Sequence, residues 1–419
     1  MKNLHKTLLC IPLLFLFSCK WVPSKDYSSV LNKTSYQTFE SLDEPLLLSF
    51  RMSPVFYWNG KQNNHTTRSY GSVYVIYDWE NARVHDFVYS KGSSSGYGSE
   101  FLLQTNDGTK TKWYGAESSD YLYSISADKT GLTEIFDGTY SCSQKISETN
   151  GRPQAVILRT DESGKSIYAF DSRTDKSNLL ASGNYSDYRK AYADGTGNYW
   201  MIRRTEKDEN KKSFFNLHKI DMSQNKICPS VKSFKQIPDD AVYDTYNGWP
   251  EHFSYEIIYA DSNHVLLSKT VYKLMPVGSD GFVNQIPCEE KIVSLNLSGM
   301  TENETAYPDA GIDDRHYYET NFAFKIGGTH YLFARIQGEN KLHAFSYDAS
   351  THALTLLDGF PKEMHSAALR NSRIYFASEK IESGNPDNHY MTLTYFDAGT
   401  QRFAGETTLS FDAVTGLVD

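Results

Sequence analysis

The chain has 419 residues, with 42 Lys or Arg against 51 Asp or Glu, so its formal net charge is −9. Aromatic residues make up 14% of the chain, which excludes a disordered protein, because disordered chains are poor in residues that bury apolar surface. An acidic chain also repels phosphates. We therefore expect a folded protein without a nucleic-acid partner.

The N-terminal segment 1–19 has the pattern of a bacterial lipoprotein signal. Lys2 and Lys6 precede an apolar run of about ten residues, which is too short to span a bilayer. The run ends in Leu-Phe-Ser-Cys at 16–19, which resembles the lipobox, where a small residue precedes the cysteine that receives lipid. The resemblance implies lipidation at Cys19 with acyl chains such as palmitate. The alternative is an ordinary secretory signal with a chance cysteine.

The lipobox also predicts where in the cell the protein is located. Cleavage before Cys19 removes Lys2 and Lys6, so the charge becomes −9 − 2 = −11, and several acyl chains would hold the protein stably on a membrane. Lys20 is not the aspartate that retains many lipoproteins in the inner membrane, which favours the outer membrane, on its periplasmic or surface side. We expect residues 1–18 to be the signal peptide, 19–41 the lipidated cysteine and a tether, and 42–419 a single domain and a monomer.

One strand–turn–strand pattern recurs along the body of the chain. Alternating strands end in Asp, Asn or Ser and are followed by short turns, which is typical of β-hairpins. The turns begin near residues 78, 126, 171, 221, 297, 348 and 397. The intervals between them are nearly equal except for the one from 221 to 297, which is much longer. Each interval contains two further apolar runs, so each unit has four strands, which we call A to D.

Four-stranded units repeated at roughly 40 to 50 residues predict an all-β fold, the β-propeller. We expect seven four-stranded antiparallel blades, with six or eight as alternatives, and residues 408–414 as a possible closing strand. A pair of β-sandwiches would not keep such a period. The expected blades are 46–88, 100–136, 143–181, 187–230, 253–307, 318–357 and 364–407.

An aromatic-rich strand followed by Asp-x-x-Thr, as in FDSRT at 170–174, resembles the broad class of secreted bacterial propellers. With the lipobox, the chain resembles a bacterial lipoprotein with a propeller domain. The repeat motifs of kelch and WD40 propellers are absent, so the resemblance implies a fold and no specific family.

Strand direction places the longest loops on one face. In an up-and-down blade, B–C and D–A loops leave on one side and A–B and C–D loops on the other. The long interval from 221 to 297 contains a D–A loop at 231–252 and a B–C loop at 273–288, and the next D–A loop is 308–317. Another B–C loop is expected at 59–71. Long loops on a rigid scaffold are where binding residues concentrate.

These loops combine aromatic, acidic and basic side chains, which suits recognition of a protein or of a glycan. The candidate binding residues are Tyr243, Tyr246, Trp249, His252, Asp313, Asp314, Arg315 and His316. The alternative is that Trp249 and Tyr246 only pack the loop against its blade.

Motifs of catalysis and metal binding are weak. The run Gly-Ser-Ser-Ser-Gly at 92–96 lacks the strand-to-helix context of a nucleophile elbow. The Asp-rich run 239–244 lacks the regular spacing of a Ca²⁺ loop. We expect no catalytic residue, metal or cofactor, and the chain to bind its partner without catalysis. A glycoside hydrolase that uses loop carboxylates such as Asp313 is the alternative.

Three cysteines remain after Cys10 leaves with the signal and Cys19 is lipidated. Cys228 and Cys288 flank the enlarged fifth unit, and a disulfide between them would fasten its insertion. The alternative is that these thiols are free and pack as small apolar groups.

Overall fold

The computed structural model describes 18 segments of the chain. They are residues 46–52, 71–78, 83–91, 103–106, 111–116, 121–126, 132–137, 140–149, 152–161, 164–171, 176–183, 188–205, 213–243, 248–277, 282–310, 316–370, 372–381 and 389–410. Their strands form seven sheets, in which each strand pairs with its neighbour in sequence. Among these segments, no helix is long and apolar enough to cross a membrane.

The first sheet has three described strands and the next two have four each. They are β1 (Leu46–Met52), β2 (Gly71–Asp78) and β3 (Arg83–Lys91); β4 (Leu103–Asn106), β5 (Thr111–Ala116), β6 (Tyr121–Ser126) and β7 (Leu132–Asp137); and β8 (Tyr140–Thr149), β9 (Arg152–Asp161), β10 (Gly164–Asp171) and β11 (Lys176–Gly183).

The remaining four sheets have four strands each. They are β12 (Tyr188–Ala193), β13 (Asn198–Arg204), β14 (Phe214–Asp221) and β15 (Lys226–Lys235); β16 (Glu251–Ala260), β17 (His264–Val277), β18 (Phe282–Asn296) and β19 (Thr301–Ala306); β20 (Tyr318–Ile326), β21 (Thr329–Ile336), β22 (Leu342–Asp348) and β23 (Ala353–Phe360); and β24 (Ser366–Arg370), β25 (Arg373–Ile381), β26 (His389–Asp397) and β27 (Arg402–Ser410).

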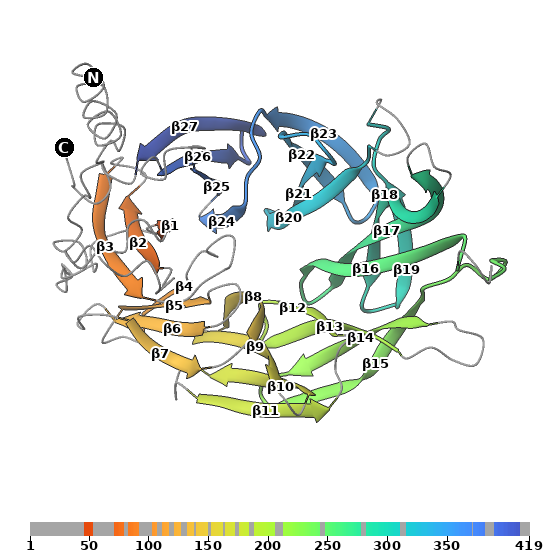
Figure 1. Cartoon of the computed structure of the whole chain (residues 1–419), viewed down its shortest axis with the longest axis horizontal. Coiled ribbons are helices and arrows are strands. Elements are labelled where there is room, and N and C mark those ends of the chain that lie inside the picture. The colour runs from red at the N-terminus through yellow and green to blue at the C-terminus, as the bar shows by residue number, and fades with distance from the viewer. Residues whose placement is uncertain are drawn as a thin grey trace, which may run out of the picture.

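The sheets are arranged in a ring (Figure 1), with the first strand of each four-stranded sheet toward the centre and the last outside. Successive first strands meet: β4 contacts β8, β8 contacts β12, β12 contacts β16, and β16 contacts β20. The β1–β3 sheet lies beside the β24–β27 sheet. This arrangement confirms the expected β-propeller, and its sheets match the expected repeat units within a few residues.

The core lies between neighbouring sheets, so the middle sheets bury both faces. On β17, Val265 and Leu267 pack toward the β12–β15 sheet, whereas Leu266 between them packs toward the β20–β23 sheet. On β21, all of 330–334 is buried. The outer strand β19 is almost wholly exposed. A sandwich buries only one face of each sheet, so inner strands with this burial pattern belong to a propeller.

The Asp- and Asn-ended C–D turns are stabilised by their own side chains. Asp221, Asn296 and Asp348 each accept hydrogen bonds from the backbone N–H and the hydroxyl of the serine two residues later, at 2.6 to 2.9 Å. The fourth residue after each has a positive φ, as at Met300 (52°) and His352 (61°). The repeated Asp and Asn residues are therefore turn-forming groups.

Two expected loops differ from the structure. The B–C loop expected at 273–288 is mostly strand, because β17 and β18 continue in register to the pair Val277 and Phe282. The D–A segment is shorter than expected, since β15 ends at Lys235 and β16 begins at Glu251. Of the expected closing strand, residues 408–410 belong to β27, and the rest lies outside the described residues.

Of the two alternatives for Cys228 and Cys288, the structure shows the one without a disulfide between them. Cys228 lies on the outer strand β15. Cys288 lies on β18 in the next sheet, where the pairing with β17 shifts register, and its Sγ donates to the carbonyl of Val271 in its own sheet at 3.4 Å. The two thiols therefore belong to different sheets.

Candidate functional site

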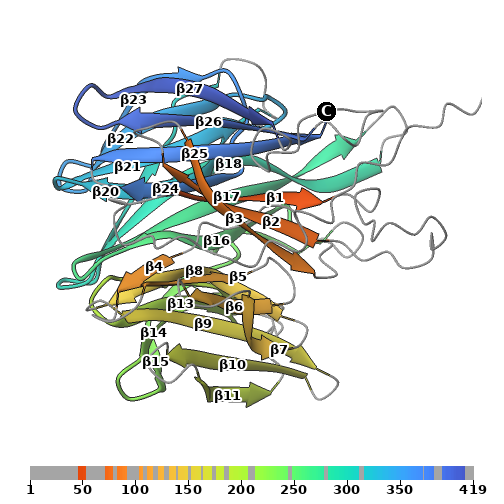
Figure 2. The same ribbon diagram turned by 90° about the vertical axis from the view of Figure 1, so that its left-hand side faces the viewer.

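The extended hairpin of β17 and β18 marks one face of the ring. Figure 2 shows these strands projecting on the side opposite to the turn that joins β22 to β23. Glu251, the first residue of β16, pairs with Lys273, and Ala306, the last residue of β19, pairs with Lys291. Residues 274–277 and 282–290 therefore extend beyond the four-stranded part of the sheet. We call these two segments the ribbon and this side of the ring the ribbon face.

Both edges of the ribbon are protected against adding another strand. Successive residues of an antiparallel strand direct their backbone groups alternately to its two sides. On the outer side of β17, the N–H of Leu274 donates to the Pro250 carbonyl at 3.0 Å, and Pro276 has no N–H. On the outer side of β18, the N–H of Gln285 donates to the Asn284 side chain at 3.0 Å, and Pro287 has no N–H. Prolines and N–H groups that are already bonded make these edges poor templates for β-pairing, which favours contact through the side chains of the ribbon.

The D–A segment beside the ribbon contains two of the expected binding residues. The rings of Tyr243 and Trp249 meet edge to face, with centroids 5.1 Å apart. Gln285 of the ribbon donates from Nε2 to the Trp249 carbonyl at 2.7 Å. Trp249 is half-buried, whereas Tyr243 is 37% exposed and Val242 is 80% exposed. Trp249 therefore helps to hold the segment on the ribbon, and Tyr243 and Val242 face solvent.

His252 lies on β16 rather than in a loop, and its ring stacks on that of its cross-strand partner Tyr272 with centroids 4.6 Å apart. Its Nδ1 is buried and has no hydrogen-bond partner. Burial, and then the positive charge of Arg204, lower the pKa of His252. His252 is therefore a neutral, packed ring at neutral pH, and its stacked face is not free to bind a ligand.

His316 precedes β20 on the same face, next to Gly338, which has a φ of 85°. A Cβ at Gly338 would lie 3.8 Å from the imidazole Nε2. The structure thus brings Tyr243, Trp249, His252 and His316 to one face, as the strand parity predicts. The remaining expected residues, Cys19, Tyr246, Asp313, Asp314 and Arg315, lie outside the described residues, as do 59–70 of the expected B–C loop and residues 92–96.

Four of the seven large apolar side chains that are exposed among the described residues lie on the ribbon face. Phe214 begins β14, Val242 and Tyr243 lie in the D–A segment, and Val283 lies on the ribbon and is 42% exposed. The other large apolar side chains that are exposed among the described residues, Leu179, Val231 and Leu356, lie on outer strands. On the ribbon face, exposed apolar residues are therefore contributed by three different connections between strands. Neither Val242 nor Val283 was singled out from the sequence, where each reads as an ordinary strand or loop residue.

A buried carboxyl lies at the base of the ribbon. Glu290 is 3% exposed and accepts hydrogen bonds from the Thr320 backbone N–H at 2.9 Å and the Thr320 hydroxyl at 2.5 Å. Burial, the largest effect, raises its pKa to about 7, although the bonds from Thr320 oppose the rise. The sequence reasoning missed Glu290, because an acid within Cys-Glu-Glu-Lys reads as exposed until Thr320 of the next sheet covers it.

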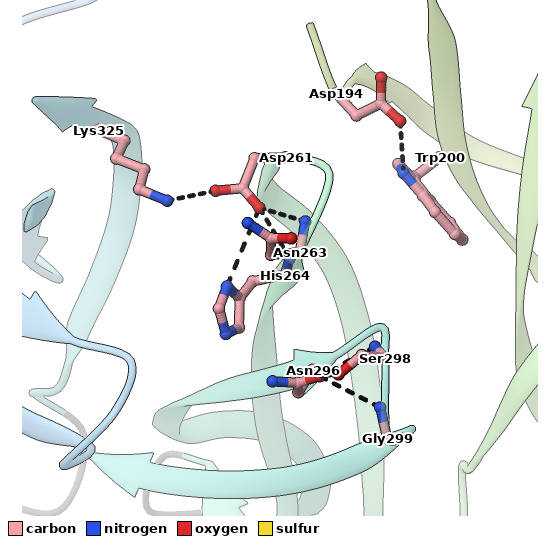
Figure 3. A network of polar contacts seen from close by, with 9 residues as sticks. All are labelled: Asp194, Trp200, Asp261, Asn263, His264, Asn296, Ser298, Gly299 and Lys325. Atoms are coloured by element: carbon pink, nitrogen blue, oxygen red, sulfur yellow. Dashed lines mark hydrogen bonds and ion pairs between the residues drawn. The ribbon is translucent and has the colours of Figure 1, made fainter. Parts of the chain in front are cut away.

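The opposite face is made of short turns with internal polar networks (Figure 3). Asp194 accepts from the Thr196 backbone N–H at 2.8 Å and from the Trp200 indole at 3.3 Å. Asp261 accepts from Lys325 of the next sheet at 2.6 Å. The hydrogen-bonding groups of Asp194 and Asp261 are thus paired with neighbouring residues of the protein. This pairing assigns both carboxylates to the scaffold. Within the described segments, no group of three His, Cys, Asp or Glu side chains could hold a metal ion.

No model of a known protein family matches the chain, and no curated protein matches it. Solved structures are similar to it at low identity. TolB from Acinetobacter baumannii is 11% identical, with 83% of this chain and 78% of TolB covered and a TM-score of 0.38. The β-propeller domain of the trilobed protease from Pyrococcus furiosus is 11% identical (90% and 95% covered, TM-score 0.45), and an oligogalacturonate lyase from Vibrio parahaemolyticus is 9% identical (88% and 86%, 0.43).

Proposed function

We propose that the protein is a lipid-anchored β-propeller of the bacterial envelope that binds a protein partner through its ribbon face. The observation that carries the proposal is the group of exposed apolar side chains on this face: Phe214, Val242, Tyr243 and Val283. Aromatic and apolar groups in the centre of an interface provide most of its binding energy, and residues from separate loops on a rigid ring form a preorganised surface.

The aromatic geometry favours a protein over a glycan. Sugar rings stack on open aromatic faces, but His252 and Tyr272 already stack on each other, and Tyr243 meets Trp249 edge to face. The ribbon edges are also protected, so the partner is recognised by side-chain contacts. A glycan remains an outcome that the test distinguishes.

The test compares two matched double variants of the soluble form, residues 20–419. Val242→Ser/Val283→Ser removes exposed apolar groups from the ribbon face, and Leu179→Ser/Leu356→Ser removes groups of similar exposure from outer strands. Partner capture from envelope extracts, followed by titration of the captured protein, should show at least a tenfold weaker affinity for the first variant, which is about 1.4 kcal/mol, and no change for the second. Equal capture by both variants would refute the proposal, as would turnover or binding of a glycan by a panel assay.

The anchor is tested separately. Labelling of whole cells with palmitate should mark the full chain and not a Cys19→Ser variant, and membrane fractionation should recover the labelled chain in the outer membrane. Label that persists in the variant would contradict lipidation at Cys19.

A further inference from the structure

Glu290 joins the base of the ribbon to the next sheet. It pairs with Thr270 across β17 and β18, and both of its bonds from Thr320 come from β20, the first strand of the neighbouring sheet. Tyr307, which follows β19, extends the chain of contacts through a 2.7 Å hydrogen bond between its hydroxyl and that of Thr320. Glu290 and Tyr307 therefore both bond to Thr320, and Glu290 is the ionisable carboxyl of this polar contact between the two sheets.

No cation bonds to this carboxyl among the described residues. Lys269 on β17 pairs with Glu304 at 2.6 Å, and Lys291 on β18 pairs with Glu289 at 3.5 Å. A buried carboxylate without a cation is unfavourable, since burial penalises the charged form.

The groups that face Glu290 from each packed element are neutral or negative. They are the Ser268 hydroxyl on β17, the Tyr307 hydroxyl after β19, the Tyr317 hydroxyl before β20, and Thr320 and the Glu319 carboxylate on β20. Glu319 itself pairs with Arg335 on β21 at 3.2 Å, and Arg335 also pairs with Glu363. Tyrosine and serine remain neutral across the ordinary pH range, and burial raises the pKa of Tyr307 well above its usual value. Glu290 is thus the group in this cluster that changes charge near neutral pH.

We propose that Glu290 is a proton-dependent clamp, which holds the ribbon against the next sheet when it is protonated and loosens it when it is ionised. The sign follows from linkage. A carboxyl that binds its proton more tightly in the closed, buried state favours that state at low pH. This preference is lost as the pH rises through the pKa that the carboxyl has in the closed state. The clamp also has a consequence for binding, which rests on the proposed function. The ribbon face should bind its partner more tightly in mildly acidic than in alkaline solution.

Hydrogen exchange of the ribbon amides tests the clamp without any partner. With a carboxyl that titrates near pH 7 when buried and at 4.5 when open, linkage predicts that the opening equilibrium of residues 282–289 rises about 30-fold between pH 5.5 and pH 8.5. Glu290→Gln keeps the shape and the acceptor oxygen but has no proton to lose. Its ribbon protection, corrected for intrinsic exchange, should stay flat.

Two further variants keep the inference falsifiable. Glu302→Gln removes an exposed carboxylate of β19 in the same sheet and should retain the wild-type pH dependence. Thr320→Val removes a hydroxyl that lowers the pKa of Glu290, so the midpoint should move to higher pH. A change of less than threefold in wild type, or the same change in Glu290→Gln, would overturn the clamp. Failure to capture any partner would count only against the proposed function.

Discussion

The ion pair that joins the fifth and sixth sheets on the face opposite the ribbon allows a quantitative prediction. Asp261 follows β16 and accepts the backbone N–H groups of Asn263 and His264, both at 2.8 Å, and Lys325 Nζ at 2.6 Å (Figure 3). Each backbone bond contributes about 1 kcal/mol net. The partly exposed ion pair contributes about 0.5–1 kcal/mol after screening. Asp261→Ala should therefore lower the free energy of unfolding by about 2–3 kcal/mol.

Lys325→Met separates the two contributions, because it removes the ion pair and leaves both backbone bonds to Asp261 intact. It should cost about 0.5–1 kcal/mol, and in its background Asp261→Ala should cost correspondingly less than alone. The free energies come from guanidinium denaturation of the four proteins at neutral pH. If Asp261→Ala and Lys325→Met lowered the free energy of unfolding equally, the two backbone bonds to Asp261 would not make the larger contribution.

The same residue predicts a pH dependence. Burial is the largest single effect and raises the pKa of Asp261, but the hydrogen bonds from Lys325 and from the two backbone N–H groups together lower it below 3.8. A carboxyl with a lowered folded-state pKa stabilises the fold above its unfolded value, and this contribution is lost as pH falls through the folded value. The stability difference between wild type and Asp261→Ala should therefore shrink below pH 3.8, and a constant difference would contradict it.

Three other outcomes are expected. Phe333 is fully buried, and its ring centroid lies 4.8 Å from that of Phe376. Phe333→Ala should therefore lower the free energy of unfolding by about 3–5 kcal/mol in denaturation. A loss below about 1 kcal/mol would show that Phe333 does not join the sheets. Gln401 is exposed and has a φ of 56°, so Gln401→Gly should raise stability by about 0.5–1 kcal/mol, whereas a loss would contradict the strain. Alkylation of the unfolded, unreduced chain should label both Cys228 and Cys288 in mass spectrometry, and an unlabelled pair would indicate a disulfide.

Much of the fold was predictable because its signals are local. A turn such as Asp348 to Ala353 is stabilised by hydrogen bonds between close neighbours in the chain, so its residue types reveal it without knowledge of the rest of the chain. The regular spacing of these turns then predicts the repeat. The parity of the strands predicts which face carries the longest connections, and Tyr243, Trp249, His252 and His316 do lie on that face.

The ribbon was not predictable in the same way. Pro276, Pro287 and a Gly-rich tip read as a loop, because proline removes an N–H from a ladder. Both prolines lie where β17 and β18 have no further neighbour on that side, so the two strands stay paired to Val277 and Phe282 in spite of the register shift beside Pro287. A proline interrupts the pairing only where its missing N–H faces a neighbouring strand. Which side of the strand faces a neighbour cannot be read from the sequence.

The sequence by itself determined the repeating hairpins, because each turn satisfies its own polar groups, and it determined the propeller through their period. Only the tertiary structure decided what lies between the sheets. Glu290 is buried and meets Thr320 because the ring places the next sheet over it. Cys228 and Cys288 form no disulfide, and the ring assigns them to separate sheets. Burial and charge depend on neighbours that are distant in the chain, and those neighbours are set by closure of the ring.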